Sequence, residues 1–291
     1  MLLNPSEYIK TNFFKEKFEE KIVIVSDTDI ETKNPFEKFQ IQEPVWQILA
    51  LSKKYKFVFV VLDRLNWDNI FRLYKNLPSN VCVINLNAGY TGLGKKVILA
   101  DLDDIYINPQ VQVKEPMDFE NFKFLVNEFL ENPTLTHIRV PSKDMEERIG
   151  NEEICLDYDE IIDFSEYGIS GYNGAVLCYG SMLQESLNAV GLLQAEGLWV
   201  DLYWLGDYKK FSVDFIKKLE SQERIFVIGD FDAKLFRDYF YSKFCEFGLE
   251  GKEIHFIYPE NLQQVVPEFL SEQVKMQPTD IYEKIHQIIQ I

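Results

Sequence analysis

The clearest structural signal in this chain is the run Gly171-Tyr172-Asn173-Gly174-Ala175-Val176-Leu177-Cys178-Tyr179-Gly180-Ser181-Met182. Its centre, residues 174–179, is mostly apolar and short, which is typical of a buried β-strand. A Gly-Ser turn follows, and apolar residues then recur with helical spacing over residues 181–196. The run therefore predicts a strand that leads directly into a helix, the repeating unit of parallel sheets with covering helices.

The same alternation continues toward the C-terminus. It predicts strands over residues 199–205, 224–230 and 253–258, and helices over residues 212–221, 233–247 and 279–289. We therefore expect one α/β domain to occupy residues 168–291.

Strands and helices also alternate in the first half of the chain. The pattern predicts strands at 21–26, 57–62, 81–86 and 136–140, and helices at 44–55, 67–77 and 119–131. Pro44 suits the first turn of its helix, where no backbone hydrogen bond is lost. We expect a first domain over residues 1–145 and an acidic linker over residues 146–167. The predicted fold class is two consecutive three-layer α/β domains with mainly parallel sheets.

Composition excludes some classes of partner. The 47 acidic and 30 basic side chains give a formal charge of −17, which repels nucleic acid and anionic lipid headgroups. The first residues have no signal-peptide core, and no run approaches the roughly 18 apolar residues of a membrane helix. We expect a cytoplasmic protein with no nucleic-acid or membrane partner.

The ordered set of motifs resembles the C-terminal half of the transketolase family, which includes deoxyxylulose-phosphate synthase and the β-subunits of 2-oxo-acid dehydrogenases. In the second half the resemblance rests on residues 171–182, 196–201 and 278–282. In the first half it rests on Phe39-Gln40-Ile41-Gln42-Glu43, Leu86-Asn87-Ala88-Gly89-Tyr90-Thr91-Gly92 and Thr136-His137-Ile138-Arg139-Val140-Pro141. It implies a pyrimidine-binding domain followed by the family's C-terminal domain, without the pyrophosphate-binding domain.

The resemblance also implies a role for Glu43. In this family a glutamate hydrogen-bonds the aminopyrimidine ring of thiamine diphosphate and so promotes loss of the thiazolium proton, while the cofactor supplies the carbanion chemistry. Glu43 is the residue that matches this catalytic and cofactor-binding position. The alternative interpretation is a solvated carboxylate that interacts with the dipole at the start of the helix at Pro44.

An aromatic platform is the second expected part of the cofactor site. Family members stack the aminopyrimidine on an aromatic residue just after the second strand, and here Leu65 occupies the matching position. Trp67 and Phe71 follow as possible substitutes. Plain packing is the alternative role for Trp67.

Two departures from the family pattern bear on activity. The segment after Gly92 holds no histidine that matches the family's substrate-binding one, and the chain has no Gly-Asp-Gly motif for the magnesium that bridges the diphosphate. The resemblance therefore implies a transketolase-like subunit that transfers a two-carbon ketol or related acyl unit together with a partner. That partner, an N-terminal transketolase-like subunit, would supply the magnesium. A homodimer is also expected, and the alternative function is an inactive structural or regulatory partner.

Metal chemistry has only weak signals in this sequence. Asp27-Thr28-Asp29 follows the predicted strand at 21–26, and Asp101-Leu102-Asp103-Asp104 follows the apolar residues 97–100. Such paired carboxylates can hold a divalent ion or form ordinary acidic loops. The four cysteines, Cys82, Cys155, Cys178 and Cys245, are far apart and have no CxxC spacing. We expect buried free thiols and assign no metal ligand.

Overall fold

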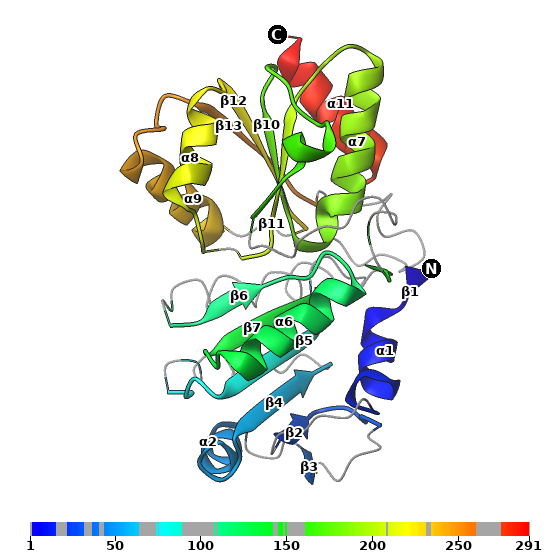
Figure 1. Ribbon diagram of the computed structural model, residues 1–291, viewed down its shortest axis with the longest axis vertical. Helices are drawn as coiled ribbons and strands as arrows, with labels where there is room; N and C mark the ends of the chain where they lie inside the picture. Colours follow the sequence, from blue (N-terminus) through cyan, green and yellow to red (C-terminus); the bar gives the residue numbers. More distant parts are fainter. Residues whose placement is uncertain are drawn as a thin grey trace. The chain divides into compact units, whose positions relative to one another are not determined.

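The chain forms two compact units, each with its own sheet (Figure 1). The first unit is Met1–Thr91 with Ala100–Arg148, and the second is Gly92–Leu99 with Ile149–Ile291. The computed structural model describes residues 2–15, 22–31, 37–40, 44–63, 74, 76–88, 108, 110–141, 145–147, 149, 161–207, 209–230, 234–259 and 275–290. Among these residues no helix combines the length and apolarity needed to cross a membrane.

A six-stranded parallel sheet forms the centre of the first unit, in the order β3-β2-β4-β5-β7-β6. Every residue of β2, β4 and β7 is buried, as expected for a parallel sheet that is covered on both faces. The strands are β2 (Ile22–Ser26), β3 (Glu37–Gln40), β4 (Phe57–Leu62), β5 (Val81–Ala88), β6 (Gln112–Lys114) and β7 (Thr136–Pro141).

Helices cover both faces of this sheet. One connection runs from β3 to β4 through α2 (Pro44–Lys54), and another runs from β6 to β7 through α6 (Phe119–Glu131). These two connections cross the sheet in opposite directions, so right-handed crossovers place α2 and α6 on opposite faces. The remaining described elements of this unit are α1 (Pro5–Thr11), the 3-10 turn η1 (Phe13–Lys15), and an antiparallel pair of β1 (Leu2–Leu3) with β8 (Met145–Glu146).

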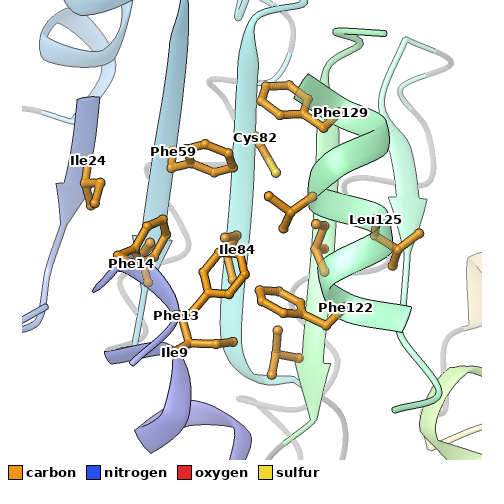
Figure 2. Close-up of a cluster of buried hydrophobic side chains, with 14 of the residues drawn as sticks. Ile9, Phe13, Phe14, Ile24, Phe59, Cys82, Ile84, Phe122, Leu125 and Phe129 are labelled. Atoms are coloured by element: carbon orange, nitrogen blue, oxygen red, sulfur yellow. The ribbon is translucent and has the colours of Figure 1, made fainter. Parts of the chain in front are cut away.

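The hydrophobic core of the first unit lies between the sheet and the layer formed by α1, η1 and α6 (Figure 2). Phe59 of β4 is at its centre and is fully buried. Its ring makes edge contacts with Phe14 of η1 at 5.8 Å and with Phe129 of α6 at 5.4 Å between ring centroids. This layer therefore depends on aromatic side chains that come from three separate parts of the chain.

The second unit is built on a five-stranded sheet in the order β13-β12-β10-β11-β9. Neighbouring strands are parallel except for β9, which runs antiparallel to β11. The strands are β9 (Ile161–Asp163), β10 (Ala175–Tyr179), β11 (Asp201–Leu205), β12 (Arg224–Ile228) and β13 (Glu253–Ile257).

Two pairs of helices cover opposite faces of the second sheet (Figure 1). The chain moves from β10 to β11 in one direction along the sheet, and then back past β10 to β12 and β13. Right-handed connections therefore place the helix between β10 and β11 on one face, and the two helices that follow β11 and β12 on the other face. The last helix, α11, packs on α7. The helical segments are η2 (Phe164–Tyr167), η3 (Gly180–Met182), α7 (Leu183–Ala195), α8 (Val213–Glu220), α9 (Lys234–Glu246) and α11 (Pro278–Ile289).

Two glycines explain why the run of residues 171–182 has its sequence. A Cβ atom on Gly171 would lie 2.0 Å from the carbonyl carbon of Trp199, so no larger residue fits there. Gly180, at the start of η3, has a φ of 49°, a left-handed conformation that favours glycine. Both glycines therefore serve the turn geometry on either side of β10.

The structure confirms the predicted fold class and most of the predicted elements. It also contains five short strands that the sequence pattern did not predict, β1, β3, β6, β8 and β9. The segment β9–η2 belongs to the stretch that was predicted as a linker, while the predicted domain limits at 145 and 168 stay predictions. The expectation of buried thiols holds for Cys82 and Cys178 but is wrong for Cys245, which is exposed near the end of α9; Cys155 is outside the described residues.

We predict that Phe59→Ala lowers the free energy of unfolding by about 3–5 kcal/mol, because the change leaves a cavity among aromatic rings that cannot close around it. Urea denaturation followed by circular dichroism measures this loss. The matched control is Phe124→Ala on the exposed side of α6, which we expect to change stability by about 0.5 kcal/mol or less. Equal losses for the two variants would contradict the central position of Phe59.

Candidate functional site

The strands of the first sheet are parallel, so they end along one edge, which we call the carboxyl edge. Its strand ends are Ser26, Gln40, Leu62, Ala88, Lys114 and Pro141. In open α/β sheets, ligands bind in the loops beyond this edge. The carboxyl edge is therefore the first place to look for a functional site in this unit.

Two aspartates join the ends of β2 and β4 at this edge. The backbone N–H of Asp63 donates to Oδ1 of Asp27 at 2.8 Å, and Nζ of Lys10 lies 2.7 Å from Oδ2 of Asp63. Asp27 was one of the residues considered for a divalent ion. Its carboxylate instead holds the backbone that follows the neighbouring strand, and no group of three or more potential metal ligands occurs among the described residues.

A row of polar side chains crosses β5, β7 and β6 near their carboxyl ends. Asn85 is the Cα partner of Arg139, and Glu115 directly follows β6. Arg139 and Glu115 form an ion pair in which both side chains are 0% exposed. Ile138 and Val140 belong to the core beneath α6. Because neighbouring residues of a strand point to opposite faces, Arg139 lies on the other face.

His137 lies on the same face of β7 as Arg139, two residues further from the carboxyl edge. Its Nδ1 lies 2.6 Å from the hydroxyl oxygen of Tyr74, and both side chains are buried. Tyr74 belongs to the stretch between β4 and β5, so this hydrogen bond ties that stretch to β7. All three histidines of the chain lie at predicted strand or helix positions, where a structural role is expected, and the buried, hydrogen-bonded His137 has this kind of environment.

Sequence reasoning did not select Asn85, Glu115 or Arg139 as a connected group. The available signal was a polar residue between two apolar neighbours in each of two strands, Asn85 in β5 and Arg139 in β7. Burying a charge without a partner costs several kcal/mol, so a charged residue in such a strand indicates a partner elsewhere in the fold. The partner, Glu115, is identified only when the strand order is known.

The residues predicted for the cofactor site lie outside the described residues. Glu43 falls between the end of β3 at Gln40 and the start of α2 at Pro44. Leu65, Trp67 and Phe71 come after β4, which ends at Leu62. Their predicted roles therefore stay predictions. The strands that precede them in the chain, β3 and β4, belong to the first sheet.

The second sheet also gathers charged groups at the ends of its strands. Asp207, just after β11, is buried, and its Oδ1 accepts a hydrogen bond from the backbone N–H of Lys209 at 2.8 Å. Burial lowers the pKa of Lys209 to about 8, and the negative charge of Asp207 opposes this shift. Burial also raises the pKa of Tyr179 at the end of β10, and the charge of Asp207 raises it further.

Comparison with solved structures shows what this arrangement resembles as a whole. A structure described as a split-gene transketolase, inactive β4 tetramer, matches with a TM-score of 0.71 and 14% identity, over 93% of this chain and 92% of that chain. Transketolase from Campylobacter jejuni subsp. jejuni NCTC 11168 matches with a TM-score of 0.66 and 11% identity, over 92% of this chain and 44% of that chain. No protein-family model and no curated protein matches the sequence. The two units therefore share the fold of the C-terminal half of transketolase.

We predict that Arg139→Met destabilises the chain by about 3–5 kcal/mol, because it leaves the buried Glu115 carboxylate without its ion pair. The double variant Arg139→Met/Glu115→Leu should be less destabilised than the sum of the two single changes. Urea denaturation of all three variants measures the coupling. As a control, Asp214→Asn removes the exposed ion pair with Lys217 and should change stability by about 1 kcal/mol or less. Additive single changes would contradict the coupling.

We predict that Lys209 titrates at about 8 and that Asp207→Asn lowers this pKa further, because the variant removes the negative charge that favours the ammonium form. Between pH 8 and the ordinary lysine pKa the unfolded chain binds more protons, so the contribution of Lys209 to stability rises with pH in this window. NMR titration of ¹³C-methylated lysines, assigned with Lys209→Arg, measures the pKa. The control Asp214→Asn should leave it unchanged, and an unshifted value in Asp207→Asn would refute the assignment.

Proposed function

We propose that this chain is a transketolase-like subunit that contributes the aminopyrimidine side of a thiamine diphosphate site. The observation that carries the proposal is the match along almost the whole of both chains to the split-gene transketolase structure. A chain with these two units corresponds to the part of the fold in which the family places the activating glutamate. The diphosphate and its magnesium would then be held by a partner subunit.

The place of Glu43 in the chain is compatible with this proposal. In sequence it comes after β3, which ends at Gln40, and just before α2, which begins at Pro44, and α/β folds place ligands beside connections from a strand end to a helix. A glutamate there would accept a hydrogen bond from the ring and shift it to the imino tautomer, which is a proton-transfer role. Trp67 and Phe71, or Leu65 as an aliphatic surface, would pack against the ring after β4. Thiamine diphosphate itself would supply the carbanion stabilisation.

The polar row of Asn85, Arg139 and Glu115 gives such a site a rigid base. Its ion pair is excluded from water and joins β6 to β7, so these strand ends are held in register without any ligand. Preorganised groups cost little reorganisation when a ligand binds. In this proposal the row acts as a positioning element, and it does not contact the reacting atoms.

A second candidate function is a non-catalytic partner. The specific observation in its favour is that the matched split-gene structure is described as an inactive β4 tetramer. The sequence is also without the family's substrate histidine in the segment after Gly92. A chain of this kind would keep the fold and its assembly surfaces and would regulate or support an active subunit.

We predict that the purified chain alone shows no ketol transfer, and that binding of thiamine diphosphate with magnesium requires an added N-terminal transketolase subunit. Isothermal titration of the cofactor into the mixture measures the affinity. Glu43→Gln should weaken binding about tenfold, because it replaces a charge-assisted hydrogen bond with a weaker neutral one.

The matched control is Glu131→Gln at the exposed end of α6, which should bind as the unchanged chain does. If Glu43→Gln binds the cofactor as the unchanged chain does, Glu43 is not part of the site. Absence of binding in every mixture, together with a stable complex between the subunits in analytical ultracentrifugation, would select the non-catalytic partner instead.

A further inference from the structure

The second unit contains a cavity at β13, the last strand of its sheet. The cavity has a volume of about 470 Å³ and is lined by residues 254–258, by Arg237 and Tyr241 of α9, and by Lys284 and Ile288 of α11. This volume is within the roughly 300–1,000 Å³ typical of sites for small organic molecules.

The cavity extends around the edge of the sheet. Phe256 contacts the rings of Phe240 and Tyr241, so alternate residues of β13 face α9. His255 points to the other face, on which α11 lies (Figure 1). The lining therefore combines Arg237 from one side of β13 with Lys284 from the other, and both helices belong to the same unit.

The charges around this cavity differ from those of the rest of the chain. None of its lining residues that the structure describes is acidic, although the chain has a formal charge of −17. Its charged residues are two permanent cations, Arg237 and Lys284, and His255 adds a ring nitrogen, Nε2, that has no hydrogen-bond partner among the described residues. Oε2 of Glu253 lies 3.8 Å from this nitrogen, which is an ion-pair distance but too long for a hydrogen bond. An anion is the group that these side chains would bind.

Arg237 is held in a defined orientation at one side of the cavity. Its Nη1 donates to the hydroxyl oxygen of Tyr258 at 3.3 Å, and the guanidinium carbon lies 5.1 Å from the centroid of the Tyr258 ring. A guanidinium that stacks on an aromatic ring keeps its planar face packed and can direct other N–H groups to a carboxylate or phosphate. Ile254, Phe256 and Ile288 give the rest of the lining an apolar character.

We propose that this cavity binds an organic anion that carries a phosphate or carboxylate group on an apolar, aromatic or similarly flat body. Arg237 would form the charge-assisted hydrogen bonds to the acidic group, and Lys284 would add a donor from the α11 side. The body would pack between the tyrosine and isoleucine side chains. This site is independent of the thiamine diphosphate proposal, because it lies wholly in the second unit.

The test uses phenyl phosphate and benzoate as probes, with benzyl alcohol as the neutral comparison, in isothermal titrations of the full chain. We expect at least one anionic probe to bind and the neutral probe not to bind, and the stronger anion identifies phosphate or carboxylate as the preferred group. Arg237→Gln should weaken binding about tenfold, and the double variant with Lys284→Gln should weaken it further. Circular dichroism checks that each variant is folded.

The matched control is Lys217→Gln on α8, where the side chain is 64% exposed and pairs with Asp214 on the same helix. This variant should bind as the unchanged chain does. Because the Lys284 side chain is only partly buried, we expect Lys284→Gln to stay folded even where Arg237→Gln is unstable. The proposal is overturned if Lys284→Gln and the double variant keep the affinity of the unchanged chain, or if Lys217→Gln weakens binding equally. It is also overturned if benzyl alcohol binds as well as the anions, or if neither anion binds.

Discussion

Burial of both faces of a parallel sheet is the constraint on which the rest of each unit depends. In β2, β4 and β7 every residue is buried, so helices must cover the two faces and each connection between parallel strands must cross the sheet. Crossover connections of one hand then determine on which face each helix lies. They also bring all the strand ends of a sheet to one edge. The carboxyl edge of the first sheet, with its polar row, is a consequence of this packing.

Charged groups inside such a fold require specific partners. Arg139 in the buried strand β7 is stable because Glu115 follows the adjacent strand β6. The same requirement explains the Tyr74–His137 hydrogen bond, which ties the stretch between β4 and β5 to the sheet. In the second unit, Asp207 is buried just after β11, and its carboxylate accepts a hydrogen bond from the backbone N–H of Lys209. Buried polar groups in both units thus connect segments that are distant in the sequence.

Most of the fold was predictable because hydrophobic period and length are local properties. The strand at 57–62 and the helix at 119–131 have the predicted limits, and an Asp118 cap at α6 explains why that helix starts where it does. The strands β1, β3, β6, β8 and β9 were missed because each has four residues or fewer and lies at a sheet edge, where the fold imposes little hydrophobic pattern. The cofactor residues Glu43, Leu65, Trp67 and Phe71 came from resemblance of motifs. The polar row and the cation-lined cavity had no continuous motif to indicate them.

The amino-acid sequence alone established the fold class, the order of most elements and the exclusion of a strongly basic surface, since these follow from periodicity and composition along the chain. Strand order is a different kind of information, because a strand pairs with neighbours that the sequence does not specify. Only the tertiary structure therefore placed Glu115 beside Arg139, and only it assembled Arg237, His255 and Lys284 around the end of the second sheet. The physical reason is that these groups interact across segments whose proximity depends on how the whole sheet is packed.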